Sequence, residues 1–449
     1  MMPAVIRFSG ILSFIIIFNM VHQTISAAER CPCDIYANGK TPCVAAHSTV
    51  RALYSLYNGP LYQVRRASDN KTKDIGVLTL GGLVNSAVQD SFLIGTTGTI
   101  SIIYDQSGNG NNLTSAPGGE AVGDSDKEVT ADRSRFKING NTAYAAYFEG
   151  GMGYRNNKTS GIATGDQPEG LYMVTSGKHF NNKCCFDYGN AETTNNDDCA
   201  GTMEAIYFGN STEWGKGSGS GPWVMADLEN GLFGGTDFNA NTANISLTND
   251  YVTATLKGKS HFWAIKGGNS QSGKLSTLYN GTRPAQKDWP TNCGYDPMRK
   301  QGAIILGIGG DNSNWSVGTF YEGAMTSGYP SDSTENAVQA NIVSAGYGSN
   351  VTSISYSTGK TLNVSNFSAN YNPLNGKAVI GYNVQDTRHV DITIVDQCGR
   401  RVAEIVNGVV PGGSHTAVWD AKRAPSGVYL CKVVIDKTEM RAGKIVVGR

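Results

Sequence analysis

Two acidic side chains stand at alternate positions in the segment Trp223-Val-Met-Ala-Asp-Leu-Glu229. Side chains alternate between the two faces of a β-strand, so this spacing places Asp227 and Glu229 on the same face as Trp223. The intervening residues then face an apolar core: Val224, Ala226 and Leu228. Two carboxyl groups beside a flat ring could cleave a glycosidic bond, because acids act on the acetal while the ring covers an apolar sugar face. The alternative is an ordinary solvated strand face, which this segment taken alone favours.

A third carboxyl group, Asp311, ends a glycine-rich segment that begins at Ala303. In a strand, one set of alternate residues would face the apolar layer: Ile304, Leu306 and Ile308. The other set, Gly307, Gly309 and Asp311, would lie on the opposite face, where glycines leave room for a ligand to approach the backbone. A turn in which Asp311 caps the backbone is equally compatible with the pattern.

Two adjacent cysteines, Cys184 and Cys185, are a further candidate feature. Neighbouring Cα atoms lie about 3.8 Å apart across a trans peptide, which is closer than ordinary disulfides prefer. A disulfide between them would form a strained ring, and strain of this kind is typical of functional sites. The ring would present a rigid apolar surface that suits a sugar face. Alternatively, each cysteine pairs elsewhere in the chain, for instance with Cys199 or Cys293.

The composition predicts that short strands position these residues. Gly contributes 56 of 449 residues, which is typical of an all-β protein with tight turns. A helix is expected over residues 44–56, and the length suggests two globular units. Charged residues are only 16% of the chain, and 37 Lys and Arg equal 37 Asp and Glu, so no net field attracts nucleic acid or anionic lipid. A neutral partner such as a sugar fits better.

Residues 1–28 have the pattern of a secretory signal peptide, with Arg7, an apolar stretch over residues 11–18 and small residues up to Ala28. No later segment reaches the roughly 18 to 20 apolar residues that a membrane span needs. Export permits disulfides, although nine cysteines leave at least one unpaired within a monomer. Their spacing matches no zinc site, so we expect neither a metal nor another cofactor.

The last part of the chain differs in composition. Residues 347–367 are rich in Ser, Thr, Asn and Gly and are interpreted as a linker. Residues 368–449 contain about six or seven alternating runs between turns, which predicts a small immunoglobulin-like β-sandwich. The segments YNPLNGKAVIGYNV and DITIVDQCGRRVAEIV resemble the sorting modules of type IX secretion and a flagellar-hook-cap-like sandwich. A spacer domain or a carbohydrate-binding sandwich is the alternative.

Long motifs occur in order along residues 33–347: CDIYANGKTPCVAAHSTVRALYS, SIIYDQSGNGNNLTSAP, CCFDYGNAET, GPWVMADLENGLF and GAIILGIGGDNSN. Together they resemble glycoside hydrolase family 54, whose members are fungal and bacterial α-L-arabinofuranosidases. The resemblance implies a catalytic domain over residues 29–346 with the fold of a two-sheet, jelly-roll-like (concanavalin-like) β-sandwich.

Matching the family's motifs residue by residue implies roles for the candidates. Glu229 would be the nucleophile and Asp311 the general acid/base, and Asp227 and Asn230 would hold sugar hydroxyls. The remaining contacts would come from Cys184, Cys185 and Trp214 as apolar walls and from the backbone of Gly310. The implied disulfide residues are Cys33, Cys43, Cys184 and Cys185. The pairing of the other cysteines stays open: Cys31, Cys199, Cys293, Cys398 and Cys431.

The resemblance implies a retaining, exo-acting enzyme that releases terminal L-arabinofuranose from arabinoxylan or arabinan by double displacement. Retention requires carboxyl groups roughly 5 to 5.5 Å apart, with Asp311 protonated and Glu229 ionised. The alternatives are a β-D-xylosidase or other pentosidase, and a non-catalytic, lectin-like arabinan-binding protein. The expected partners are plant cell-wall polysaccharide and, through the C-terminal module, export machinery. We expect an extracellular monomer, free or attached to the cell surface.

Overall fold

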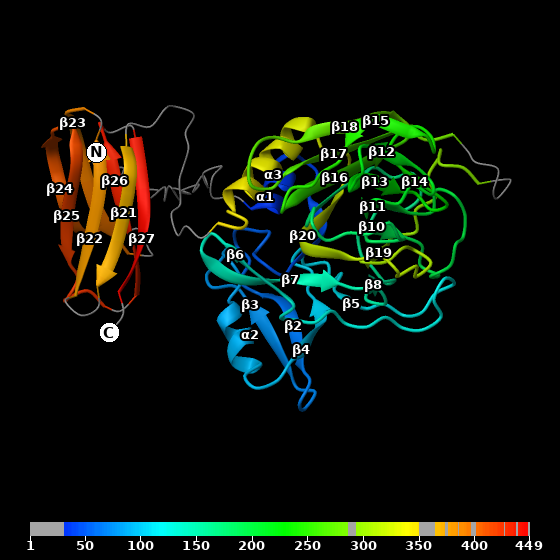
Figure 1. Ribbon diagram of the computed structural model, residues 1–449, viewed down its shortest axis with the longest axis horizontal. Coiled ribbons are helices and arrows are strands. Elements are labelled where there is room, and N and C mark those ends of the chain that lie inside the picture. The colour runs from blue at the N-terminus through cyan, green and yellow to red at the C-terminus, as the bar shows by residue number, and fades with distance from the viewer. Residues whose placement is uncertain are drawn as a thin grey trace, which may run out of the picture.

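The computed structural model shows two β-rich bodies (Figure 1). It describes residues 31–285, 293–349 and 364–447, apart from residues 373–375, 385, 397–400, 426 and 437–438. The predicted signal peptide, residues 1–28, lies outside the described residues, as does most of the predicted linker, residues 347–367. In the described part of the chain, no helix is long and apolar enough to cross a membrane.

One sheet of the larger body has eight antiparallel strands, on the path β18-β17-β16-β9-β20-β7-β6 with β1 pairing β20. The strands are β1 (Cys43–Ser48), β6 (Ser134–Ile138), β7 (Asn141–Phe148), β9 (Glu169–Thr175), β16 (Val252–Lys259), β17 (Phe262–Asn269), β18 (Ser276–Thr282) and β20 (Gly318–Ser327). Helices α1 (Pro32–Asn38) and α3 (Asp332–Ser344) pack against each other. Lys257 of β16 contacts Glu335 of α3 at 2.8 Å, so α3 covers the outer face of this sheet.

The facing sheet has ten antiparallel strands in the order β14-β13-β11-β10-β19-β8-β5-β4-β2-β3. The strands are β2 (Pro60–Arg66), β3 (Thr72–Gly76), β4 (Gly98–Ile103), β5 (Leu113–Ser115), β8 (Tyr154–Asn156), β10 (Asp187–Ala191), β11 (Glu204–Gly209), β13 (Trp223–Asp227), β14 (Leu232–Phe233) and β19 (Ala303–Leu306). The remaining elements are helix α2 (Ser86–Phe92) and a parallel pair, β12 (Lys216–Ser218) with β15 (Ala240–Ile245). The larger body is therefore a β-sandwich of antiparallel sheets, as predicted.

The main apolar core lies between the two sheets and receives residues from both. The alternation predicted for β13 is confirmed, since Val224, Ala226 and Leu228 lie in this core. Trp223 and Met225 pack instead in a second cluster, on the outer face of the ten-stranded sheet. Strand β13 therefore presents one face to the main core and the other to the outer side of the ten-stranded sheet, where Asp227 ends the strand.

Strand β19 follows the prediction only as far as Leu306. Ile304 and Leu306 lie in the main core, but Ile308 packs with Ile305 in a separate cluster on the outer face. The strand ends at Leu306, and Gly307 has a φ of 83°, a left-handed conformation that breaks the alternation. The expectation that Ile308 faces the main core was wrong for this reason.

The helix predicted over residues 44–56 is also wrong. This segment begins with β1, which pairs with β20 through Ala45 and Met325. A helix lies earlier, at α1, where Pro32 occupies the first turn and Asp34 accepts a hydrogen bond from the Cys31 N–H at 2.9 Å. Pairing with a buried central strand outweighs the local helix preference of residues 44–56.

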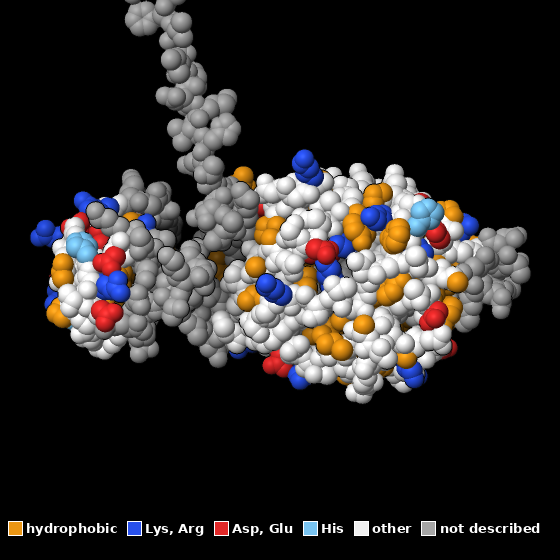
Figure 2. All heavy atoms as spheres, turned by 90° about the horizontal axis from the view of Figure 1, so that it is seen from above, with side chains coloured by type: hydrophobic (Ala, Val, Ile, Leu, Met, Phe, Trp, Pro, Cys, Tyr) orange, Lys and Arg blue, Asp and Glu red, His pale blue; other side chains and the backbone are white. Residues whose placement is uncertain are grey.

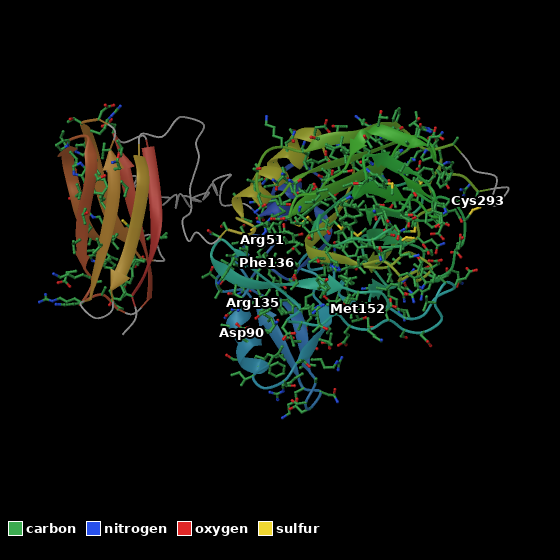
Figure 3. All side chains as sticks on the ribbon, viewed as in Figure 1. Arg51, Asp90, Arg135, Phe136, Met152 and Cys293 are labelled. Atoms are coloured by element: carbon green, nitrogen blue, oxygen red, sulfur yellow. A yellow bond between two sulfur atoms is a disulfide. The ribbon has the colours of Figure 1, made fainter. Side chains whose placement is uncertain are left out.

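Three disulfides form in the described part of the chain: Cys33–Cys43, Cys184–Cys185 and Cys199–Cys293. The first two confirm the predicted disulfide residues, and the third answers a pairing that the sequence left open. Cys293 lies at the outer edge of the larger body (Figure 3). Cys31 is buried without a disulfide partner among the described residues, whereas Cys398 lies outside them.

The smaller body has two antiparallel sheets that share one apolar core. One sheet contains β21 (Val364–Asn372), β22 (Lys377–Val384) and β25 (Gly413–Asp420); the other contains β23 (Arg388–Val395), β24 (Arg401–Val410), β26 (Gly427–Ile435) and β27 (Glu439–Val447). In this core the ring of Trp419 meets that of Tyr429 at a centroid distance of 5.1 Å. Strand β21 begins at Val364, inside the stretch that the sequence predicts to be a linker.

Charged side chains are dispersed over one face of the molecule. Figure 2 shows Lys and Arg side chains scattered among Asp and Glu on one face, without an extended patch of one sign. This distribution agrees with the equal numbers of basic and acidic residues in the sequence. It gives no electrostatic basis for binding a polyanion on that face.

Candidate active site

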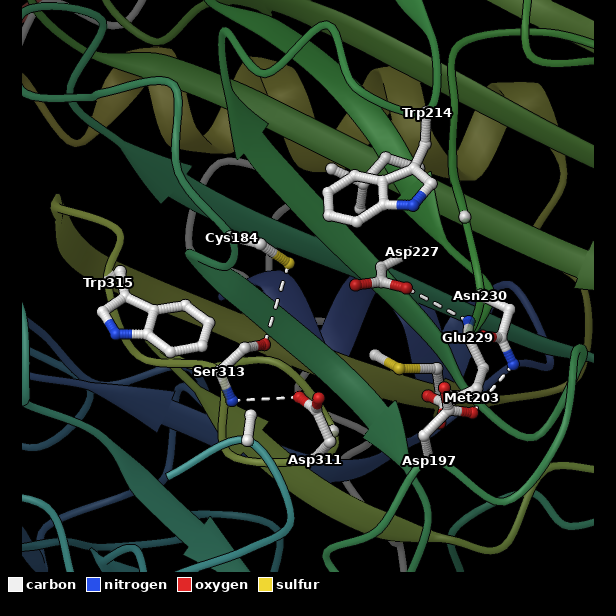
Figure 4. Close-up of a pocket in the computed structure, with 14 residues that line it drawn as sticks. Cys184, Asp197, Met203, Trp214, Asp227, Glu229, Asn230, Asp311, Ser313 and Trp315 are labelled. Atoms are coloured by element: carbon white, nitrogen blue, oxygen red, sulfur yellow. Dashed lines mark hydrogen bonds between the residues drawn. The ribbon is translucent and has the colours of Figure 1, made fainter. Parts of the chain in front are cut away.

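A pocket of about 220 Å³ opens on the outer face of the ten-stranded sheet (Figure 4). This volume is below the roughly 300 to 1,000 Å³ of clefts for drug-sized ligands, so it suits one small ring. The lining residues are Ala121, Cys184, Asp197, Met203, Trp214, Asp227, Glu229, Asn230, Gly231, Leu232, Gly310, Asp311, Ser313 and Trp315. Acidic and aromatic side chains thus share the walls of one cavity.

Asp227 ends β13, and Glu229 follows it in a tight turn. Glu229 and Asn230 have positive φ angles of 61° and 53°, which are uncommon for residues with side chains and typical of functional sites. The Glu229 N–H donates to Asp227 Oδ1 at 3.1 Å, Asn230 Nδ2 donates to Asp197 Oδ1 at 2.8 Å, and the Tyr295 hydroxyl donates to Asn230 O at 2.9 Å. Asp227 and Glu229 are only 6% and 5% exposed, so the interpretation as a solvated strand face is wrong.

Asp311 reaches the same pocket from the loop after β19. Its Oδ1 accepts a hydrogen bond from the Ser313 N–H at 3.0 Å, so the turn that the sequence suggested as an alternative is also present. The Ala121 N–H donates to Asp311 O at 3.0 Å, and the Cys185 N–H donates to Ser313 O at 3.1 Å. Because β11 and β10 lie between β13 and β19, the Asp311 loop and the Glu229 turn belong to different strand ends.

The apolar walls come partly from the adjacent cysteines. Cys184 and Cys185 form a disulfide with each other, so the alternative in which each pairs elsewhere is wrong. The peptide between them is cis, with Cα atoms 2.9 Å apart, instead of the trans peptide that we assumed from the sequence. Cys184 and Trp214 line the pocket. Cys185 does not, because it is fully buried beneath the pocket against Tyr207 and its neighbours.

Two further acids, which the sequence analysis did not single out, lie buried behind the pocket. They are Asp187 of β10 and Glu192, which directly follows that strand. Among the described residues, the four oxygens of these two carboxyl groups have no conventional hydrogen-bond donor. A Cβ atom added at Gly310 would collide with the Glu192 carboxyl group, which therefore lies against the Gly310 backbone. The Arg155 guanidinium brings a positive charge here and donates to the carbonyl oxygens of Gly310 and Glu192.

Burial raises the pKa of several acids in this cluster. It raises the pKa of Asp227 to about 7 and that of Glu192 to about 8. The pKa of Glu229 lies well above its usual range because of burial first and repulsion from Glu192 second. Burial also lowers the pKa of the Arg155 guanidinium. The raised pKa of Glu229 differs from the expectation that Glu229 is readily ionised. The physical reason is that several buried carboxyl groups lie around a single guanidinium, that of Arg155.

Asp187 is the natural holder of one proton in this cluster. Burial, and then the neighbouring Asp227, keep its pKa well above the usual range. Two neighbouring carboxylates repel each other, so this pair is more stable when one of them carries a proton. A proton on Asp187 would leave the negative charge of the pair on Asp227, which lines the pocket.

All the residues predicted to be catalytic or to bind substrate, except Cys185, line the pocket: Cys184, Trp214, Asp227, Glu229, Asn230, Gly310 and Asp311. Sequence reasoning missed the others: Ala121, Asp197, Met203, Gly231, Leu232, Ser313 and Trp315. Ser313 and Trp315 follow Asp311 in the same short segment, and this nearness in sequence is a signal that could have identified them. Ala121 and Asp197 come from loops whose sequences carry no periodic signal. The roles assigned to the predicted residues stay predictions.

A comparison with known proteins identifies the family. Residues 32–348 match the family model described as alpha-L-arabinofuranosidase B, catalytic. The chain belongs to the alpha-L-arabinofuranosidase B family. The catalytic model of this family covers the larger body, and the expected resemblance to glycoside hydrolase family 54 is confirmed. Residues 371–448 match a second model, described as a secretion system C-terminal sorting domain.

Individual relatives of the alpha-L-arabinofuranosidase B family agree with this assignment. The alpha-L-arabinofuranosidase B of Aspergillus oryzae is 57% identical over 320 residues, which cover 70% of this chain and 62% of that relative. This chain thus spans less than two thirds of the relative's length. A solved glycoside hydrolase family 54 α-L-arabinofuranosidase, soaked with a cyclic sulfate inhibitor, is 51% identical with a TM-score of 0.68 over 79% of this chain and 75% of that one. An arabinofuranosidase complexed with arabinofuranosyl-α-1,2-xylobiose is 44% identical with a TM-score of 0.67 over 90% and 88%.

Proposed function

We propose that this protein is a retaining, exo-acting α-L-arabinofuranosidase that releases terminal L-arabinofuranose from the side chains of arabinoxylan or arabinan. The observation that carries the proposal is the convergence of Glu229 and Asp311, from two separate strand ends, on one small pocket. Family membership supports the same reaction class, because a pair of carboxyl groups is the usual machinery of glycoside hydrolysis.

The reaction would proceed in two displacements. In the first, Glu229 attacks the anomeric carbon while the Asp311 carboxyl group gives its proton to the departing glycosidic oxygen. In the second, Asp311 removes a proton from a water molecule, which attacks the same carbon and frees Glu229. Two inversions at one carbon give net retention, and the expected carboxyl separation of roughly 5 to 5.5 Å belongs to this geometry.

The other lining residues would orient the sugar. Asp227 and Asn230 are positioned to accept and donate hydrogen bonds to its hydroxyl groups, because both are anchored in the Glu229 turn. Cys184 and Trp214 would cover its apolar faces, and Gly310 offers backbone without a side chain. Fixed positions of this kind convert binding energy into correct orientation of the reacting atoms.

Proton placement follows from the burial of the acid cluster. Glu229 must be ionised to act as a nucleophile, although burial disfavours its charge. We infer that Asp187 and Glu192 carry protons in the resting enzyme, so that negative charge concentrates on the groups that face the pocket. The carboxyl groups titrate as one coupled set, and the pH dependence of the rate reports the set as a whole.

The pocket size and the family relatives guide the choice of substrate. A cavity of about 220 Å³ takes a single terminal sugar, which favours exo action over cleavage inside a chain. A relative that was solved with arabinofuranosyl-α-1,2-xylobiose supports an arabinose branch on xylan as the substrate of this chain too. A β-D-xylosidase is the competing specificity, because two pentoses differ by only a few contacts.

The Glu229→Gln variant tests the proposal against a matched control. Arabinose release from 4-nitrophenyl α-L-arabinofuranoside should fall by at least about 10³-fold, because an amide is a poor nucleophile. Glu213→Gln, an exposed glutamate in the loop that carries Trp214, should keep wild-type activity. Unchanged release by Glu229→Gln would contradict the assigned role. Faster release of xylose than of arabinose from the matching nitrophenyl glycosides would favour the competing specificity.

For the C-terminal body we propose an immunoglobulin-like sandwich that directs export, with an extracellular location for the enzyme. The match to a secretion sorting domain supports this role, and the shared core of the two small sheets supports the fold. Mass analysis of the protein from culture medium and from washed cells tests it. A full-length protein confined to the cytoplasm would contradict an export function.

A further inference from the structure

Trp315 is a large apolar side chain that stays half exposed beside the pocket. It lines the pocket from the loop that carries Asp311, and it is 51% exposed. The other described tryptophans are buried or partly buried: Trp214, Trp223, Trp263 and Trp419. Leaving an indole ring in water forgoes the free energy of its burial, so this position requires a physical reason.

Hydrogen bonds fix the backbone of Trp315 on both sides. Its N–H donates to Cys184 O at 3.2 Å, and its carbonyl oxygen accepts from Asn181 Nδ2 at 3.1 Å. The next residue, Ser316, donates from its hydroxyl group to Asn181 Oδ1 at 3.0 Å. The indole ring is therefore carried by an anchored backbone that is also tied to the pocket wall. Such a surface binds a flat partner at low cost in conformational entropy.

The position of Trp315 relative to the acids indicates which part of a substrate it meets. Under the proposed function, Asp311 protonates the departing oxygen, so the sugar unit attached to that oxygen leaves the pocket on the Asp311 side. In Figure 4, Trp315 and Asp311 lie on the side of the pocket away from Glu229. The indole ring is thus placed beside the departing sugar unit and not beside the arabinofuranose.

We propose that Trp315 is a stacking platform for the pyranose unit that carries the arabinofuranose branch, an inference that rests on the proposed function. A pyranose ring with equatorial hydroxyl groups presents a flat face of C–H groups, which matches the indole plane. A furanose ring is puckered and covers less of that plane. The exposed face of Trp315 therefore selects a xylan-type backbone over a chain of arabinofuranose units.

Two substitutions and two substrates test this subsite. Trp315→Leu keeps an apolar side chain but removes the ring, and Trp315→Phe keeps a ring. For each variant, kcat/KM is measured on arabinofuranosyl-α-1,2-xylobiose and on methyl α-L-arabinofuranoside, which has no second sugar. We expect Trp315→Leu to lower the ratio of the two constants by about 10-fold, and Trp315→Phe to keep most of it. A general loss of folding or catalysis would lower both constants by the same factor and would leave this ratio unchanged.

Binding provides a second readout that does not depend on turnover. In the Glu229→Gln background, adding Trp315→Leu should weaken binding of arabinofuranosyl-α-1,2-xylobiose by about 10-fold in calorimetry. An unchanged ratio of constants overturns the subsite, as does a greater loss on α-1,5-linked arabinobiose than on the xylobiose substrate. A wild-type protein that releases arabinose from neither substrate overturns the proposed function instead.

Discussion

Replacing Gly119 with alanine tests whether the position of Asp311 controls the rate. Gly119 does not line the pocket, but a Cβ atom added there would lie 2.5 Å from the carbonyl oxygens of both Asn195 and Asp311. These oxygens belong to the backbone, so they cannot rotate away as the end of a side chain would. The Asp311 oxygen also accepts the hydrogen bond from Ala121, which couples the two loops.

The size of the effect of Gly119→Ala follows from these distances. Real Cβ contacts are seldom closer than 3.0–3.4 Å, so the backbone at Asp311 must move by about 0.5 to 0.9 Å. Misplacing a catalytic group by about 1 Å costs on the order of 10²-fold in rate. We therefore expect kcat to fall by about 10- to 100-fold, with about 1 to 3 kcal/mol less stability from overpacking.

The assay compares two leaving groups. A nitrophenolate departs with little help from an acid, whereas an alkoxide needs a proton, which Asp311 gives in the proposed mechanism. Gly119→Ala should therefore lose more kcat/KM, which reports the first displacement, on methyl α-L-arabinofuranoside than on the 4-nitrophenyl glycoside. Gly123→Ala is the control, because it lies in the same loop and its added Cβ atom meets nothing within 4 Å. Wild-type kcat in Gly119→Ala, or equal losses of kcat/KM on both glycosides, would refute the reasoning.

Two further predictions concern stability. The buried Lys300 contacts Glu169 at 3.0 Å and Glu204 at 2.7 Å. Lys300→Met leaves these carboxylates without that counter-charge, so the free energy of unfolding measured in urea should fall by about 3 to 5 kcal/mol. The control, Arg65→Met in an exposed ion pair, should lower it by at most about 1 kcal/mol. Burial raises the pKa of Glu192 from 4.5 to about 8, so the folded state binds this proton more tightly and loses stability as pH rises from about 4.5 to about 8. Thermal unfolding at pH 5 and pH 9 should therefore show a smaller decrease for Glu192→Gln than for wild type; an equal decrease would contradict a buried, protonated Glu192.

The sequence allowed β13 and its acids to be placed correctly because the strand is regular up to Asp227. Alternation works only while the backbone stays extended, and it failed at Ile308, where Gly307 adopts a positive φ. The helix expected over residues 44–56 failed for a different reason, since pairing with β20 decides the conformation there. Local sequence patterns therefore predicted the type of an element correctly where pairing with a distant strand did not favour another conformation.

The buried acids show why part of the site could not be predicted. Asp187 and Glu192 are visible in the motif CCFDYGNAET, but nothing local says that both are withdrawn from water. Their burial depends on β11 and β19, which flank β10 in the sheet and come from distant parts of the chain. The Cys199–Cys293 disulfide, with a sequence separation of 94, is likewise a product of the tertiary fold.

The same burial favours a neutral sugar, the proposed ligand of the pocket. Several carboxyl groups lie at the wall of the pocket and behind it. Among the described residues that act on this cluster, one buried guanidinium, that of Arg155, provides the positive charge. A negatively charged ligand would meet repulsion there, whereas a sugar hydroxyl group can donate to Glu229 Oε1, which lines the pocket and has no hydrogen-bond partner among the described residues. In the proposed resting enzyme, protons on Asp187 and Glu192 reduce the repulsion between acids without adding a cation that would compete for Glu229. In the proposed mechanism, a buried acid cluster with one counter-charge thus supplies a nucleophile, a proton donor and acceptors for hydroxyl groups in a cavity sized for a single ring.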